Sequence, residues 1–286
     1  TEAEMDGYIM AVDQGTTGTR VILFNHSGEI RAMAYEELNQ IYPNPGWVEH
    51  DPFEIWQSVQ SCAEKALNQI AAKADQVLAI GITNQRESTI LWDRETGKPV
   101  YNSICWQCRR SAELCEGLKR EGYEEKIKER TGLLIDAYFS ATKIQWVLRN
   151  VPEAKELLNK NRLCFGTVDS WIIWNLTGGS RHATDHTNAS RTLLYNIHNL
   201  GWDTEILKWL DIPESILPEI VPSSGKAIGY TNPQSFLGAK IPIAGVAGDQ
   251  HAATFGQACF HPGMAKNSYG TALALMMNIG TEPDRK

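Results

Sequence analysis

Short polar segments that lie far apart in the chain carry the residue types that could do chemistry. In the first, YIMAVDQGTTGTRVILF (8–24), an apolar run ends in Asp13 and a small, hydroxylated turn follows. Backbone N–H groups of such a tip, with the hydroxyls of Thr16 and Thr17, could cradle phosphate oxygens. A carboxylate repels bare phosphate, so Asp13 fits there only if a cation such as Mg²⁺ lies between them. An ordinary hairpin with a polar tip is the alternative, and the segment is not a P-loop because no Gly-Lys-Ser/Thr follows.

Polar residues also follow two apolar runs that are typical of buried strands. TNQRE (83–87) follows the first run, and Asp249 follows the second. The carboxyl ends of such strands are where α/β proteins bind ligands. Arg86 donates and Glu87 accepts hydrogen bonds, so this pair suits neutral hydroxyls, while Asp249 could take a proton from an alcohol. A surface ion pair and a helix N-cap are the alternative interpretations of these residues.

Two aromatic residues and a second threonine-containing tip complete the candidate set. Trp106 ends a short predicted strand and Tyr138 lies between predicted helices, and either could belong to the core instead. NSYGT (267–271), followed by the apolar run ALALMMNIG, resembles the opening hairpin. Two such tips could hold the same phosphates across a cleft, although chance repetition explains the likeness equally well.

Composition excludes several classes of function. The chain has 286 residues with 42% hydrophobic residues, enough for a substantial core, and a net charge of −7 disfavours nucleic acid or an anionic membrane as the main partner. No apolar run is long enough for a membrane helix. Cys105 and Cys108 are spaced as C-x-x-C but lack a second ligand pair for zinc. We therefore expect reduced thiols in a cytoplasmic protein.

The order of predicted elements indicates a mixed-sheet α/β domain. Three antiparallel strands open the chain up to residue 38, and Asp51, Pro52 and Glu54 mark the start of a helix that runs to about residue 72. Short apolar runs without alternation predict buried strands. The remaining predicted elements are strands at 77–82, 187–197 and 241–247, hairpins at 88–106 and 264–280, helical segments at 110–160, 168–176, 206–210 and 250–259, and an irregular stretch at 213–222.

Five segments together resemble the FGGY carbohydrate kinases, which belong to the actin and hexokinase superfamily. They are AVDQGTTGTR (11–20), ITNQRE (82–87), WQCRR (106–110), AGDQ (247–250) and KNSYGT (266–271). The resemblance implies two ribonuclease-H-like domains with ATP and substrate in the cleft between them. Residues 1–256 would form the N-terminal domain and 257–286 the first hairpin of a truncated, ATP-binding C-terminal domain. We accordingly expect weak or absent kinase activity from this chain alone.

The resemblance also implies a role for each matched residue. The reaction would be ATP-dependent phosphorylation of a polyol, expected to be glycerol, to sn-glycerol 3-phosphate, with Asp13 holding Mg²⁺ and Asp249 acting as general base. The nucleotide and transferred phosphate would contact Thr16, Thr17, Arg20 and Thr271, and the polyol would contact Arg86, Glu87, Trp106, Tyr138, Asp249 and Gln250. The full-length protein would be a cytoplasmic homo-oligomer without a nucleic-acid partner or membrane span.

Other functions remain open at this stage. Glycerol-specific members carry a Phe that closes the substrate pocket, whereas this chain has Ala274 at that position. A sibling FGGY kinase for another polyol or sugar is therefore the first alternative. A nucleotide-switched binding or assembly protein on the same fold is the second, and a polyol site argues against it because a switch needs none.

Overall fold

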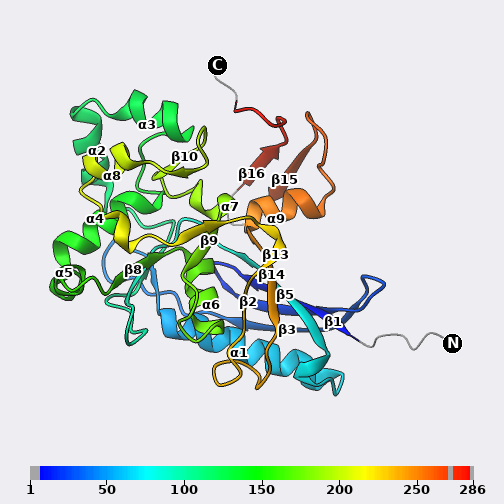
Figure 1. Ribbon diagram of the computed structural model, residues 1–286. Coiled ribbons are helices and arrows are strands. Elements are labelled where there is room, and N and C mark those ends of the chain that lie inside the picture. The colour runs from blue at the N-terminus through cyan, green and yellow to red at the C-terminus, as the bar shows by residue number, and fades with distance from the viewer. Residues whose placement is uncertain (1–6, 270–272, 284–286) are drawn as a thin grey trace.

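A six-stranded mixed sheet forms the centre of the molecule (Figure 1). The computed structural model describes residues 7–269 and 273–283. Strands β1 (Tyr8–Gln14), β2 (Gly18–Phe24) and β3 (Ile30–Glu37) are antiparallel, and β5 (Val77–Asn84) and β14 (Pro242–Gly248) add parallel to β1, in the order β13-β14-β5-β1-β2-β3. The predicted α/β mixed-sheet fold is confirmed, although the edge strand β13 (Ser224–Tyr230) was not foreseen.

Helix α1 (Pro52–Gln69) covers one face of this sheet. Asp51 caps it as predicted, because its Oδ1 accepts a hydrogen bond of 2.8 Å from the backbone N–H of Phe53. Ile55, Val59 and Ala63 recur at helical spacing and are fully buried against the sheet. Helix α1 packs directly against β2, and Thr16 and Thr17 at the tip of the β1–β2 hairpin line the cavity described below.

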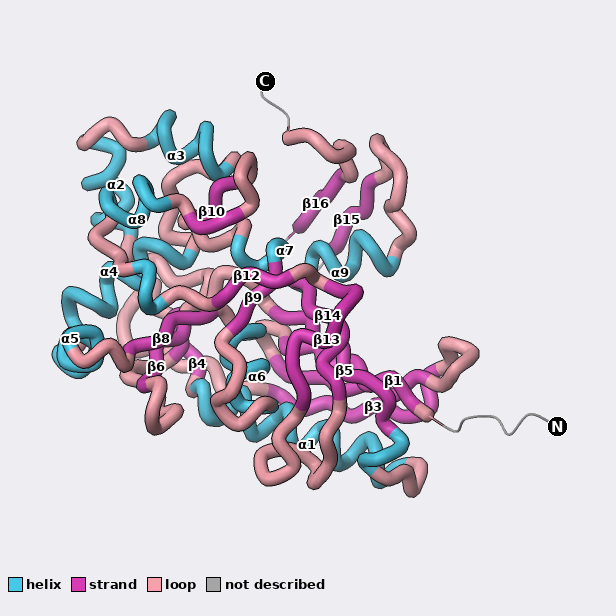
Figure 2. Tube along the Cα trace, viewed as in Figure 1, coloured by secondary structure: helices cyan, strands magenta, loops and turns pink. Residues whose placement is uncertain are grey.

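A second lobe, mostly helical, has its own buried cluster of apolar side chains and lies beside the sheet (Figures 1 and 2). The helical segment predicted at 110–160 is divided into four helices, with breaks near Gly122, Gly132 and Pro152. The helices of the lobe are α2 (Ala112–Arg120), α3 (Glu124–Thr131), α4 (Ser140–Asn150), α5 (Pro152–Asn159) and α8 (Thr204–Trp209), while α6 (Val168–Leu176) packs with the sheet.

The predicted strand at 187–197 is wrong. Residues His186–Ala189 form the short helix α7, and only Tyr195–Asn196 (β10) is extended, paired with β11 (Gly201–Trp202). Asp185 explains the difference, since its side chain accepts hydrogen bonds of 3.0 Å from the backbone N–H groups of both Thr187 and Asn188. This cap starts a helix where β-branched residues alone favoured a strand.

Two further predictions of strand pairing fail in part. The hairpin at 88–106 is reduced to isolated bridges, because β6 (Ile90–Asp93) pairs with β8 (Leu163–Gly166) and β7 (Ser103–Ile104) pairs with β4 (Glu49–His50). All four residues of β6 and of β8 are buried, so this distant pairing lies in the interior of the protein. The stretch expected to be irregular contains a 3₁₀ turn and β12 (Glu219–Val221), which pairs with β9 (Ala183–Asp185).

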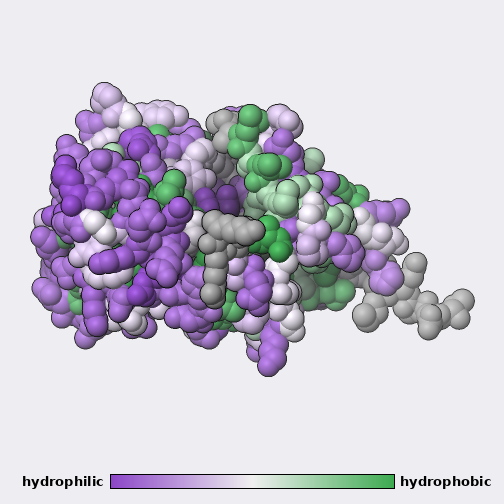
Figure 3. Space-filling model, turned by 90° about the horizontal axis from the view of Figure 1, so that it is seen from above, coloured by the Kyte–Doolittle hydropathy of each residue, from purple (hydrophilic) through white to green (hydrophobic). Residues whose placement is uncertain are grey.

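One helix and one hairpin follow β14, the last strand of the central sheet in chain order. Helix α9 (Asp249–Gly256) begins directly after β14, and the predicted hairpin appears as β15 (Ala265–Tyr269) and β16 (Leu273–Met277) beside it (Figure 1). Large apolar side chains of this hairpin are exposed, and Figure 3 shows apolar surface gathered on the face seen from above. Across the described ranges, no helix combines the length and apolarity needed to cross a bilayer.

Candidate active site

The candidate site is a cavity of about 300 Å³ between the tip of the β1–β2 hairpin, the end of β5, the start of α9 and the second lobe. A hydrophilic hollow on the upper face is visible in Figure 3. The cavity is lined by Thr16, Thr17, Gln85, Arg86, Glu87, Trp106, Tyr138, Asp249, Gln250, Ser268, Tyr269, Leu273 and Ala274. Mixed aromatic and polar walls of this size suit a small hydroxylated ligand.

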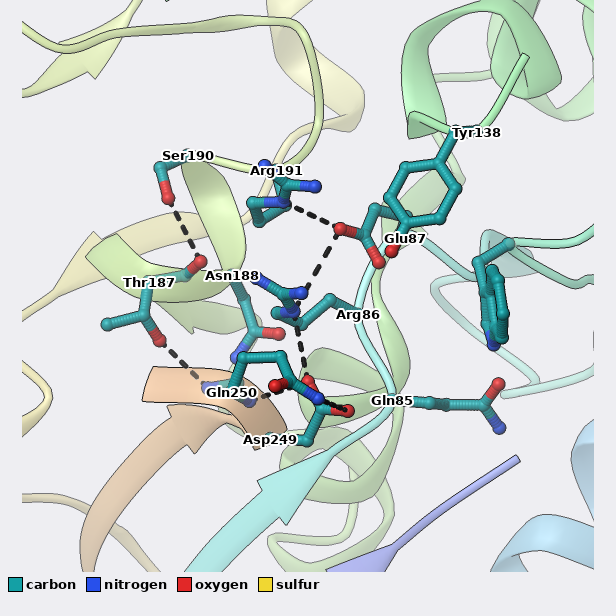
Figure 4. A network of polar contacts seen from close by, with 12 residues as sticks. Gln85, Arg86, Glu87, Tyr138, Thr187, Asn188, Ser190, Arg191, Asp249 and Gln250 are labelled. Atoms are coloured by element: carbon teal, nitrogen blue, oxygen red, sulfur yellow. Dashed lines mark hydrogen bonds and ion pairs between the residues drawn. The ribbon is translucent and has the colours of Figure 1, made fainter. Parts of the chain in front are cut away.

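Parallel pairing of β5 with β14 brings Arg86 and Asp249 together. The register places Gly248 opposite Asn84, so both strands end at the same edge of the sheet. Arg86 Nε lies 3.0 Å from Asp249 Oδ1 (Figure 4), with Arg86 buried and the Asp249 side chain 39% exposed. A side chain at Gly248 would place its Cβ 2.5 Å from Arg86 Cδ, so glycine is needed for this close approach. The ion pair therefore depends on a backbone feature as well as on its two charges.

Glu87 is the most buried carboxylate of the cavity, at 1% exposure. Its Oε1 accepts a hydrogen bond of 2.6 Å from Arg191 Nε and lies 3.9 Å from Arg86 Nε. Burial raises the pKa of Glu87, and the charges of Arg86, Arg191 and Lys143 oppose that rise. Glu87 also has a left-handed backbone with φ of 61°, which is uncommon for a residue with a side chain and occurs often at functional sites.

Trp106 and Tyr138 form an aromatic wall of the cavity, and Trp106 contacts the tip of the β1–β2 hairpin. Trp106 Nε1–H donates a hydrogen bond of 2.9 Å to Thr16 Oγ1. The ring of Tyr138 meets the Trp106 ring edge-on, with centroids 5.5 Å apart. The tip itself is closed by a hydrogen bond of 2.9 Å from Gly15 N–H to the carbonyl of Gly18.

Asp13 and Arg20 lie next to each other on β1 and β2 rather than on the cavity wall. They are paired in the sheet register, and Arg20 Nη1 is 3.6 Å from Asp13 Oδ2. Burial raises the pKa of Asp13, Arg20 lowers it, and the negative charge of Asp249 raises it further. Asp13 and Asp249 are thus close enough to repel each other, a situation that a divalent cation relieves.

The donor set near Asp13 suits a cation that arrives with phosphate. Within residues 7–269 and 273–283, His, Cys, Asp and Glu side chains do not gather in threes as a resident metal would need. Mg²⁺ typically takes one or two carboxylates and completes its shell with water and substrate phosphates. Asp13 therefore fits Mg²⁺ bound together with a nucleotide.

Most of the predicted site residues meet in this cavity. Its lining includes Thr16, Thr17, Arg86, Glu87, Trp106, Tyr138, Asp249 and Gln250, whereas Asp13 and Arg20 pair with each other and do not line it. Gln250 lies against Asp249, 3.2 Å from Nε2 to Oδ2, and contacts Lys266. Thr271 lies outside the described residues, so its predicted phosphate contact has no structural account.

Sequence reasoning assigned no role to three residues that support this site. Gln85 donates to Gln14 Oε1 at 3.0 Å, which ties the end of β5 to the end of β1. Lys143 is fully buried and donates to backbone carbonyls of Glu87, Tyr138 and Phe139. A lysine on the apolar face of a predicted helix was the available signal. Arg191 gave none, because it fell in the stretch predicted as a strand.

Comparison with known proteins decides the family. The sequence model described as "FGGY family of carbohydrate kinases, N-terminal domain" matches residues 8–256. The chain belongs to the FGGY family of carbohydrate kinases. It is 56% identical over 276 residues to a glycerol kinase of Caldanaerobacter subterraneus and 58% identical over 273 residues to glycerol kinase 2 of Thermotoga maritima, with 96% of this chain and 55% of each relative covered. This FGGY chain therefore spans about half the length of the curated relatives it matches.

Solved structures agree with this FGGY assignment. The glycerol kinase of Plasmodium falciparum, solved with ADP, superimposes with a TM-score of 0.88 at 37% identity, covering 95% of this chain and 54% of that one. The gluconate kinase of Lactobacillus acidophilus superimposes with a TM-score of 0.82 at 26% identity, covering 94% and 53%. The sheet and second lobe described above are thus shared by kinases that are named for different substrates.

Proposed function

We propose that this chain supplies the polyol-binding and magnesium-phosphate-binding part of an ATP-dependent glycerol kinase, which converts glycerol to sn-glycerol 3-phosphate. The observation that carries the proposal is the ion pair of Arg86 with Asp249, set beside buried Glu87 and next to the hydroxyl tip of the β1–β2 hairpin. Hydroxyl-binding groups and a phosphate cradle then face one small cavity. The names of the most similar relatives support glycerol as the substrate.

Glycerol binds by hydrogen bonds to the charged pair and by packing on the aromatic wall. Arg86 Nε has no hydrogen-bond acceptor of suitable geometry among the described residues, although it lies 3.0 Å from Asp249 Oδ1, so its N–H can turn to a substrate oxygen. Glu87 accepts from a hydroxyl, and Trp106 packs on the C–H edge of the carbon chain. An analogue that lacks one hydroxyl leaves a buried group unpaired and binds more weakly.

Asp249 acts as the general base on the terminal hydroxyl of the polyol. Its side chain is partly exposed at the cavity wall, and Arg86 holds one of its oxygens. A positioned base contributes about 10²–10⁴-fold to the rate, and alignment and charge stabilisation supply most of the remainder. Gln250 beside Asp249 helps to hold the polyol.

The phosphates occupy the side of the cavity formed by the β1–β2 tip. Thr16 and Thr17 donate hydroxyl hydrogen bonds and Arg20 supplies positive charge, while the phosphate contact expected of Thr271 falls outside the described residues. Mg²⁺, held through Asp13, neutralises charge on the phosphates when it is bound. The Asp13–Arg20 pair keeps both side chains on the same side of the sheet.

Residues 257–286 form the first hairpin of the domain that completes the ATP site. The match of the family model to residues 8–256 supports a boundary near that point. The protein works in the cytoplasm as a homo-oligomer, and the six described cysteines, all buried and unpaired, suit a reducing compartment.

Phosphoryl transfer from ATP to glycerol tests the proposal, assayed in the polypeptide at the length of its relatives. Glycerol-dependent ADP release is expected for the wild type, and Asp249→Asn should lose turnover by about 10²-fold or more while it still binds glycerol. A nucleotide-switched binding protein would instead bind nucleotide without phosphorylating glycerol, and Asp249→Asn would scarcely change its nucleotide affinity. Absence of glycerol phosphorylation by the wild type would contradict the proposal.

A sibling kinase for a larger polyol or sugar is the second candidate. Ala274, which lines the cavity, favours it because a small side chain leaves space there. A phosphorylation screen with glycerol, erythritol and pentuloses distinguishes the two: the first candidate requires the highest kcat/KM for glycerol.

A further inference from the structure

Arg191 lies outside the set of cavity-lining residues but contacts two of its members. Its Nε donates a hydrogen bond of 2.6 Å to Glu87 Oε1 (Figure 4), and its guanidinium lies over the rings of Phe139 and Tyr138, 4.9 and 5.6 Å from their centroids. The aromatic rings fix the plane of the guanidinium, and the hydrogen bond fixes the carboxylate. Arg191 therefore joins Glu87 to the aromatic wall.

The segment that carries Arg191 is tied to the ends of both central parallel strands. Thr187 Oγ1 accepts a hydrogen bond of 2.8 Å from Gly248 N–H at the end of β14. The amide groups of Asn188 and Asn84, at the end of β5, exchange hydrogen bonds of 2.9 and 3.2 Å. Helix α7 is thus held at the edge of the sheet where Glu87 and Asp249 emerge, and it delivers Arg191 to Glu87 with little freedom.

The backbone of Glu87 is held independently of Arg191. Its carbonyl accepts hydrogen bonds from Ser140 Oγ at 3.1 Å, Thr89 Oγ1 at 3.1 Å and Lys143 Nζ at 3.4 Å. These donors support the left-handed backbone of Glu87, while Arg191 contacts only the carboxylate. Loss of the Arg191 charge should therefore change the state of the carboxylate rather than the path of the chain.

We propose that Arg191 is a positioning residue of this site, which keeps the Glu87 carboxylate ionised and aimed at the cavity so that it can accept a polyol hydrogen bond. The polyol contact of Glu87 rests on the proposed function, whereas the effect of Arg191 on the titration of Glu87 can be tested without any ligand. The charged and titratable groups that face Glu87 are Arg86 from the same loop, Arg191, Lys143 from α4, and Tyr138. Burial lowers the pKa of Lys143 to about 8, so below that pH all three cations oppose protonation of Glu87.

Direct titration of Glu87 tests this assignment without any ligand. In protein with ¹³C-labelled glutamate side-chain carboxyls, with Glu87→Gln used to assign the signal, Arg191→Gln should move the Glu87 midpoint upward by about one pH unit or more, because an attractive positive charge is lost. Arg191→Lys keeps the charge and should hold the midpoint near the wild-type value. Arg130→Gln is the matched control: Arg130 is also partly buried and paired with a buried carboxylate, Asp203, at 3.0 Å, but does not contact Glu87.

Glycerol affinity, measured by calorimetry across the same pH range, supplies the functional readout. The pH below which affinity falls should rise in Arg191→Gln together with the Glu87 midpoint. An unchanged Glu87 midpoint in folded Arg191→Gln, or an equal shift in Arg130→Gln, would overturn the assignment whether or not the protein binds glycerol. A wild type that shows the predicted titration but no glycerol binding would overturn only the proposed function.

Discussion

Trp106 donates its indole N–H to Thr16 Oγ1 across 2.9 Å, and in the proposed function this hydrogen bond joins the polyol side of the cavity to the phosphate side. The two residues are 90 positions apart in the chain, Thr16 at the tip of the β1–β2 hairpin and Trp106 shortly after β7. The position of the hydroxyl tip is therefore linked to the aromatic residue that we propose packs on the substrate. This link predicts that a substitution on the polyol side also weakens binding of the nucleotide phosphates.

Trp106→Phe keeps an aromatic surface but removes the donor. A neutral hydrogen bond contributes about 0.5–1.5 kcal/mol net, so KM for glycerol and KM for ATP should each rise about 2–10-fold, with the fold still intact. Steady-state kinetics with each substrate varied in turn provides the measurement. A rise in KM for glycerol alone would show that the indole–Thr16 contact does not transmit between the two sides.

Ala274→Phe tests whether space at this position sets substrate size. Ala274 lines the cavity from β16, so a phenyl ring there should fill room used by a longer polyol. We expect the ratio of kcat/KM for glycerol over erythritol to increase by about tenfold, the effect of a few methylene-sized contacts. Ala274→Val is an intermediate variant for comparison, and an unchanged ratio in both would remove Ala274 as a determinant of specificity.

Asp169 gives the fold a pH dependence that has a definite sign. Burial, followed by the nearby charge of Asp185, raises its pKa from 3.8 to about 7. The native state therefore binds an extra proton between about pH 4 and pH 7, and stability from this group is present below that window and is lost as pH rises through it. Hydrogen bonds from Thr184 and Thr167 to its two oxygens, at 2.7 and 2.5 Å, hold it in place.

Asp169→Asn should remove this contribution. The wild type is expected to lose up to about 1.4 kcal/mol of unfolding free energy per pH unit from this group inside the window, and the variant should lack that slope. Urea denaturation at pH 5, 6 and 7 measures both proteins, and the difference between their slopes isolates Asp169. Parallel curves for the two proteins would contradict a proton bound at Asp169.

Arg110 is expected to be the most costly buried charge to remove. Its side chain is fully buried, forms an ion pair with buried Glu49, and places its guanidinium 3.9 Å from the ring centroid of Trp47. Arg110→Met should lower the free energy of unfolding by about 3–5 kcal/mol because Glu49 is left unpaired. The double change with Glu49→Gln should recover part of the loss.

An exposed ion pair provides the control for Arg110. Lys160, the residue that follows α5, pairs with Glu156 at 2.6 Å on the surface, and Lys160→Met should leave the free energy of unfolding nearly unchanged. Guanidinium denaturation measures all of these variants. Equal costs for Arg110→Met and Lys160→Met would show that the buried pair contributes no more than a surface pair.

Local patterns predicted the sheet but not its distant partners. The opening hairpin, α1 with its Asp51 cap, β5 and β14 each carry their own signal of period, cap or apolar run. The pairing of β6 with β8 carries none, because it depends on which buried segments lie close together after folding. The incorrect strand prediction at 187–197 has a local cause. The Asp185 cap starts the four-residue helix α7, although the β-branched residues of the segment favour a strand.

Most residues predicted for the site line the cavity, but the residues that hold Glu87 in place were not predicted. Arg86, Glu87 and Asp249 follow recognisable strands, and strand order brings them together. Arg191 and Lys143 contact Glu87, from the turn after the short helix α7 and from the buried face of α4. Lys143 carried a signal as a lysine on the apolar face of a predicted helix, whereas Arg191 carried none.

Calorimetric titration of this chain with glycerol and with 1,3-propanediol tests the central claim most directly, because the two ligands differ by one hydroxyl. The account predicts saturable binding of glycerol and affinity lower by about tenfold or more for 1,3-propanediol, since a buried polar group is then left unpaired. Equal affinities for the two ligands, or no binding of glycerol, would contradict a polyol site between Arg86 and Asp249.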